Sequence, residues 1–162
     1  NSLTEIIKGA RVEELPERIN GLINSMKEIE KELSVLRSAQ ALSQVSEIAK
    51  SAKVVNGTTV ITSLLGDGIS GDDLRKIALE LRSKAANSVV ALISVNDSKP
   101  VLVVAASDAA RAAGVKAGAL VKIGSTVLGG GGGGKDDFAQ GGGTDAAKSV
   151  DALAAISHAL VG

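Results

Sequence analysis

The stretch VVALISVNDSKPVLVVAA, residues 89–106, says most about the fold of this chain. Residues 89–95 and 101–106 are rich in β-branched and small apolar side chains, which favour β-strands. The five residues between them, 96–100, include Asn, Asp, Ser and Pro, which are typical of turns. The sequence therefore predicts two strands that are joined as a hairpin.

Strand and helix patterns alternate on both sides of this hairpin. Residues 59–65 predict another strand, which the glycines of residues 66–68 end. Ser70, with Asp73 three residues later, predicts the capped start of a helix. The remaining helices are expected over residues 108–113, over residues 117–128, and from a cap at Thr144 onward. These elements predict a mixed α/β (α+β) domain with about three or four strands and helices beside them.

The N-terminal part of the chain has a different pattern. Its apolar residues alternate steps of four and three, which give the 3.5-residue period of a coiled-coil seam. The seam consists of Leu15, Ile19, Leu22, Met26, Ile29, Leu33 and Leu36. We expect one helix from Pro16 to about residue 52, roughly 55 Å long. Residues 1–53 are then a coiled-coil-like dimerisation segment and residues 54–162 a globular domain, although packing of the seam on that same domain is an equally good interpretation.

Composition excludes several classes of function. The 18 basic residues balance 18 acidic ones, so no net positive field gathers phosphates or anionic lipids. Without Cys and with His158 alone, thiol chemistry and a multi-His metal site are excluded, so we expect no metal. No apolar run approaches the ~20 residues of a membrane span, so no membrane partner is expected. Because Phe138 is the single aromatic residue, a nucleic acid would have to be recognised through its backbone and shape.

Residues 129–143 read GGGGGGKDDFAQGGG and carry the functional signal. One interpretation is a flexible linker, as glycine-rich runs usually are. The other is a turn in which bare backbone N–H groups converge on a phosphate. Because Gly143 and Thr144 open the last expected helix, and helix N-termini bind anions, the second interpretation is favoured.

The same residues resemble the glycine-rich motif near the C-terminus of bacterial alanyl-tRNA synthetase. The motif has a glycine run, a basic residue, then Asp, an apolar residue, Ala-Gln and further glycines, as in Lys135 and residues 137–143 here. The domain that carries it is the DHH-associated C-terminal domain, which DHH-type phosphoesterases share. Asp136 replaces the usual Pro of the motif, and Gly131 replaces a basic or small polar residue.

The resemblance implies a noncatalytic cytoplasmic fragment of alanine–tRNA ligase that needs no cofactor. Its helical part would form a homodimer, and its globular part would grip the outer corner of tRNA for alanine during aminoacylation and editing. The implied tRNA contacts are Gly129, Gly130, Gly131, Gly132, Gly133, Gly134, Lys135, Gln140, Gly141, Gly142 and Gly143.

Other interpretations stay open beside this one. Arg75 and Arg82 are seven residues apart and share a helix face, which could follow an RNA backbone or simply be solvated. The chain could also be the substrate-binding domain of a DHH-type phosphoesterase or single-strand nuclease, although that family usually has His where Lys135 stands. A third alternative is a purely structural coiled-coil dimerisation domain.

Overall fold

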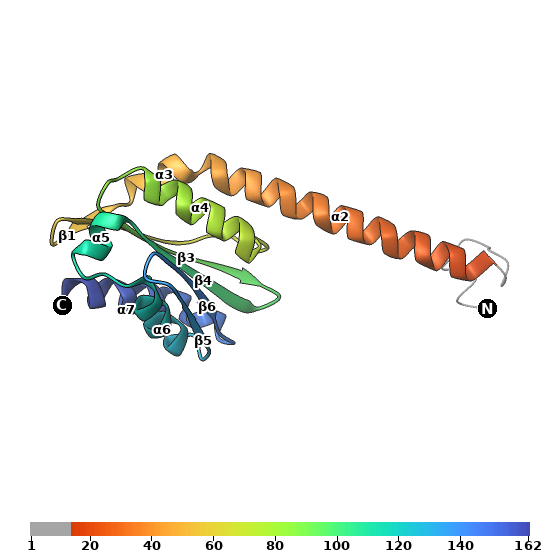
Figure 1. Cartoon of the computed structure of the whole chain (residues 1–162). Coiled ribbons are helices and arrows are strands. Elements are labelled where there is room, and N and C mark those ends of the chain that lie inside the picture. Colours follow the sequence, from red (N-terminus) through yellow and green to blue (C-terminus); the bar gives the residue numbers. More distant parts are fainter. Residues whose placement is uncertain (1–13) are drawn as a thin grey trace. The chain divides into compact units, whose positions relative to one another are not determined.

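The computed structural model describes residues 14–162, except for the side chain of Ala41 (Figure 1). The chain divides into two compact units, Asn1–Leu36 and Arg37–Gly162. The first contains most of helix α2 (Leu15–Ser43), and the second contains the end of α2 and all later elements. Residues 1–13 of the expected dimerisation segment lie outside the described residues, and the boundary after residue 53 stays a prediction.

Helix α2 carries the expected seam. From Ile19 to Leu36 its seam side chains are 44% to 66% exposed, so the described residues of this chain leave the seam largely uncovered. The expected single helix to residue 52 is wrong, because α2 ends at Ser43 and a separate short helix, α3 (Val45–Lys50), follows. In helix α3, Val45 and Ile48 are buried in the core of the globular unit.

Among the described residues, six strands form one mixed sheet in the order β1-β2-β3-β4-β6-β5. Their bounds are β1 (Lys53–Val55), β2 (Thr58–Leu64), β3 (Ser88–Asn96), β4 (Lys99–Ala106), β5 (Gly131–Gly134) and β6 (Phe138–Gly142). Strand β2 runs parallel to β3, and every other neighbouring pair is antiparallel. The expected strand count is therefore too low, because β1 is only three residues long and the glycine-rich strands β5 and β6 lack the β-branched pattern that marks strands in sequence.

The expected central hairpin is confirmed as β3 and β4. Asn96 pairs with Lys99, so Asp97 and Ser98 alone make the turn, with φ angles of 48° and 63°. Two successive left-handed residues form a type I′ turn, whose twist matches that of the flanking strands. The turn is thus tighter than the five-residue connection that the sequence indicates.

Helices cover both faces of the sheet (Figure 1). Helix α4 (Gly71–Ser83) lies on one face, and helices α6 (Ala117–Val127) and α7 (Ser149–Val161) lie on the other. Alternate residues of β3 and β4 enter the two cores, for example Val90 toward α4 and Val89 toward α6 and α7. Because both faces are buried, these strands read as continuous apolar runs.

The helix starts agree with the sequence in one case and differ in another. Ser70 caps α4 as expected, since its hydroxyl accepts a hydrogen bond from the Asp73 N–H at 3.2 Å. The expected cap at Thr144 is wrong. A 3₁₀ turn, η2 (Ala146–Lys148), comes first, α7 begins at Ser149, and the Thr144 hydroxyl instead donates to the Gly129 carbonyl at 3.4 Å.

Candidate nucleic-acid interface

The glycine tract forms the two strands at one end of the sheet. Strand β6 pairs with β4, and β5 pairs with β6 from Gly131↔Gly142 to Gly134↔Ala139. The tract is therefore an ordered hairpin rather than a flexible linker. The expected turn at a helix N-terminus is also wrong, because the backbone groups form a strand ladder and α7 starts several residues later.

One face of this hairpin lies against helix α6. A Cβ atom on Gly132 would come within 2.6 Å of Val121 Cγ1, and one on Gly141 within 2.8 Å of the same atom. No real Cβ approaches another atom so closely, so packing alone requires glycine at these two positions. Ser125 lies in the same interface and is fully buried.

The opposite face of the hairpin is open. A Cβ atom on Gly131 or Gly133 would meet no atom within 4 Å, and neither residue has a left-handed φ angle. Side chains alternate along a strand, so Phe138 and Gln140 project to this same face, as does Lys135 at the turn. We call this surface the open face and define it as Gly131, Gly133, Lys135, Phe138 and Gln140 together with Arg75 of α4.

The structure brings Arg75 and Arg82 to the hairpin. The Arg75 guanidinium carbon lies 4.6 Å from the centroid of the Phe138 ring, a cation–π contact. The Arg82 guanidinium donates to the backbone carbonyls of Ala106 and Asp137, each at 3.5 Å. The two arginines are therefore engaged with β6 and its turn rather than lying on a purely solvated helix face.

Gly129, Gly130 and Gly143 lie where the chain enters and leaves the hairpin. Gly129 follows α6 with a φ of +70°, which favours glycine. The Gly130 N–H donates to the Ser125 carbonyl at 2.8 Å, and the Gly143 N–H donates to the Pro100 carbonyl at 3.2 Å. These amides are used inside the chain and are not offered to a ligand.

The free edge of β5 presents other backbone amides. The Lys135 N–H donates to the Phe138 carbonyl at 2.9 Å. In an antiparallel ladder every second pair is hydrogen-bonded, so the next such pairs are Gly133 with Gln140 and Gly131 with Gly142. The N–H groups of Gly132 and Gly134 therefore point away from β6, and both residues are exposed. The tract's amides that are not hydrogen-bonded within the hairpin therefore lie along a strand edge, whereas the sequence predicted amides that converge in a turn.

The acidic residues of the turn lie near another cation. The pKa of Arg111 is raised, chiefly by its hydrogen bond to the Asp108 carboxylate; burial opposes this, and the charges of Asp108, Asp137 and Asp136 raise it further. The Asp136 and Asp137 backbone carbonyls accept the N–H groups of Ala117 and Ala106, each within 3.0 Å. The turn is thus fixed through its main chain.

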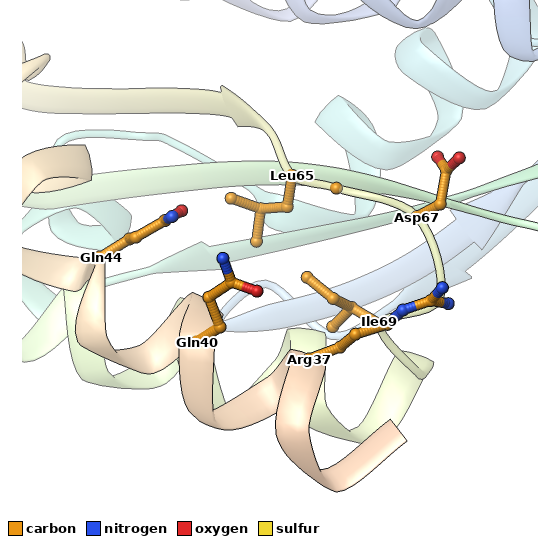
Figure 2. Close-up of a pocket in the computed structure, with 7 residues that line it drawn as sticks. Arg37, Gln40, Gln44, Leu65, Asp67 and Ile69 are labelled. Carbon is orange, nitrogen blue, oxygen red and sulfur yellow. The ribbon is translucent and has the colours of Figure 1, made fainter. Parts of the chain in front are cut away.

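A second polar site was not predicted from the sequence. A cavity of about 320 Å³ lies between the end of α2 and the loop after β2. Figure 2 shows Arg37 and Gln40 reaching from α2 toward this loop, with Gln44 one turn further along. The i, i+3, i+7 spacing of these three polar residues on a helix was the signal that could have revealed it.

Next to this cavity, Asp73 joins the end of α2 to the start of α4. The Ser38 hydroxyl donates to Asp73 Oδ2 at 2.7 Å, and the Ser70 hydroxyl donates to the same oxygen at 2.8 Å. The hydrogen bond from Ser38 is the largest cause that lowers the pKa of Asp73, burial opposes it, and Ser70 and Lys76 lower it further. The charged form of the Asp73 carboxylate is therefore the one that these hydrogen bonds stabilise in the folded chain.

Two classes of feature are not found in residues 14–162. No group of three or more His, Cys, Asp and Glu side chains is placed to hold a metal ion. Within the same range, no helix combines the length and the apolar character that crossing a bilayer requires.

Comparison with known proteins gives the family. Residues 57–162 match the family described as the DHHA1 domain. The chain belongs to the DHHA1 domain family. The match begins just before β2 and contains α4, the whole glycine hairpin and α7.

Full-length relatives of this DHHA1 chain extend the match to the N-terminal helix. The chain is 46% identical to alanine–tRNA ligase of Kocuria rhizophila over 162 residues, which is 99% of this chain and 18% of that protein. It is 41% identical to alanine–tRNA ligase of Thermobifida fusca over 163 residues, again 99% and 18%. The chain thus spans 18% of the length of these relatives, and it is homologous throughout to the C-terminal region of alanyl-tRNA synthetase.

Solved structures agree with this assignment. The C-Ala domain of Aquifex aeolicus alanyl-tRNA synthetase superposes with a TM-score of 0.64 at 29% identity, covering 68% of this chain and 98% of that domain. RecJ of Thermus thermophilus, solved with Mg²⁺, gives a TM-score of 0.52 at 14% identity, covering 80% of this chain and 19% of RecJ. The likeness to RecJ shows a shared fold alone.

Proposed function

We propose that this DHHA1 chain is the noncatalytic tRNA-binding module of an alanyl-tRNA synthetase, and that the open face contacts the tRNA. The observation that carries the proposal is the difference between two kinds of glycine in one hairpin. Packing against α6 requires glycine at Gly132 and Gly141, but no contact with the described residues 14–162 requires it at Gly131 and Gly133. Glycine at such positions is explained by a partner that approaches the backbone closely.

The charges around the open face support an RNA partner. Lys135 stands at the end of the hairpin and Arg75 beside Phe138, while Arg82 lies behind the turn. The chain as a whole carries no net charge, so these cations give a local rather than a general attraction for phosphate. A shaped surface of this kind suits a folded RNA better than an extended strand, which is usually held by several aromatic rings.

The proposal also covers the oligomeric state of the chain, its parent protein and its location in the cell. The uncovered seam of α2 would pair with a second copy to form a homodimer. In the parent ligase, which we place in the cytoplasm, the module would hold tRNA for alanine at its outer corner while the separate aminoacylation and editing centres act on it. The module itself would supply neither a metal nor a cofactor.

Titration of the chain with a tRNA transcript for alanine tests the proposal. A Gly133→Glu variant places a negative side chain in open space on the open face, so it should fold normally and bind tRNA at least about tenfold more weakly. Gly66→Glu is the matched control, because a Cβ at Gly66 also meets no atom within 4 Å and the residue lies in the loop after β2 rather than in the glycine hairpin.

Fluorescence anisotropy measures the binding, and circular dichroism shows that both variants are folded. An unrelated duplex RNA serves as competitor. Equal affinity for tRNA and for the duplex, or tRNA binding that Gly133→Glu leaves unchanged, would contradict the proposal. Binding of neither RNA would contradict it as well and would favour a purely structural domain.

A further inference from the structure

The Arg75 guanidinium is held over the ring of Phe138. A cation that only attracts phosphate by its charge would not need such a contact. Phe138 is half-buried beneath α4, and the Arg75 guanidinium lies 4.6 Å from the centroid of its ring. Arg75 itself is exposed. The ring therefore holds one side of the guanidinium, and the exposure of Arg75 leaves the group accessible to a ligand at the open face.

Gln140 lies beside this pair on the same face of β6. Its amide runs along the start of α4, since a Cβ atom on Gly71 would lie 2.8 Å from Gln140 Nε2. Gln140 is exposed. Its cross-strand partners are Val103 on β4 and Gly133 on β5, and Gly133 has no side chain to cover it. The amide can therefore both donate and accept hydrogen bonds at the surface.

We infer that Arg75, backed by Phe138, is the stacking platform for an unpaired nucleobase of the bound RNA, and that Gln140 hydrogen-bonds to the edge of that base. The inference rests on the proposed function and assigns a second kind of contact to the same surface. Guanidinium planes stack on splayed bases, and amide side chains pair with base edges, in proteins that recognise RNA loops.

Two further features favour a nucleobase as the occupant. The flat backbone of Gly131 and Gly133 leaves room for a planar ring next to the platform. Lys135 on the same face supplies a charge for the phosphate that follows the base. Phe138, the single aromatic residue of the chain, is thus used to hold the arginine rather than to stack on the base directly.

Chemical probing of bound tRNA tests the inference. Dimethyl sulfate and a carbodiimide reagent together modify the exposed pairing edges of all four bases. At saturating protein, the parent chain should protect at least one unpaired base of the tRNA. Arg75→Lys keeps the charge but loses the planar group, and Gln140→Met keeps the length but loses the amide, so both should leave that base reactive.

The affinity of Arg75→Lys for tRNA should fall about tenfold, as expected for the loss of one stacked base. Arg111→Lys is the control, because Arg111 is also exposed but pairs with Asp108, and it should retain the protection. If the parent binds tRNA without protecting any base, or if Arg75→Lys protects it equally, the stacking inference is overturned and the proposed function stands. If the parent does not bind tRNA, both are overturned.

Discussion

At the scale of single residues, two neighbouring glycines of the hairpin differ in whether they tolerate an added side chain. A Cβ on Gly132 collides with Val121 and with the Gly141 backbone, whereas a Cβ on Gly133 meets open space. Gly132→Ala should therefore lower the free energy of unfolding by about 1–3 kcal/mol, the usual cost of overpacking. Gly133→Ala should raise it by up to about 1 kcal/mol, because alanine restricts the unfolded chain. Urea unfolding of both variants measures the difference, and equal effects would show that α6 does not pack on β5 as described.

A second prediction at this scale concerns Asp73 and pH. Its folded-state pKa is lowered, mainly by the hydrogen bond from Ser38, relative to an unfolded value of about 3.9. A lowered carboxyl pKa adds stability that is present above the unfolded value and is lost as pH falls through the folded value. Asp73→Asn should therefore destabilise the chain at neutral pH and much less in acid near the folded pKa, as measured by urea unfolding. The neighbouring exposed Asp72→Asn is the control, and an equal loss at both pH values would refute the assignment.

At the scale of elements, helix α2 has an apolar seam that its own described neighbours leave exposed. Burying one such side chain gains about 1.5–3 kcal/mol, so a seam of this length can hold two copies together. Leu22→Glu, within the seam, should convert the dimer to a monomer in sedimentation velocity. Asn24→Glu adds the same charge off the seam and should leave the dimer intact. A parent chain that sediments as a monomer would contradict dimerisation through α2.

At the scale of the whole molecule, balanced charge limits how strongly salt affects RNA binding. Three cations, Arg75, Arg82 and Lys135, lie at or near the hairpin, so the slope of log affinity against log salt should be no steeper than about −3. Anisotropy titrations with tRNA at several salt concentrations measure this slope. Lys135→Gln should flatten it by about one, whereas Lys122→Gln on α6 should not change it. A slope twice as steep would indicate a broad basic surface elsewhere.

Sequence patterns predicted the elements whose side chains carry a clear periodicity. The β3–β4 hairpin, the start of α4 at Ser70 and the seam of α2 were all readable, because alternation, capping and heptad spacing are local properties. The glycine strands were not readable. A strand of glycines has no side-chain pattern, and what makes β5 a strand is its pairing with β6 and its close packing against Val121 of α6.

Local patterns in the chain are thus enough to establish the class of the fold, the helical seam and the tract in which the candidate interface lies. Which glycines serve packing and which face open space follows from the three-dimensional packing instead, because it depends on whether Val121 or solvent lies above each one. The same is true of the contact between Arg75 and Phe138, which joins residues that are far apart in the chain. Local patterns record the period of an element, whereas the surroundings of each residue depend on elements that are distant in sequence.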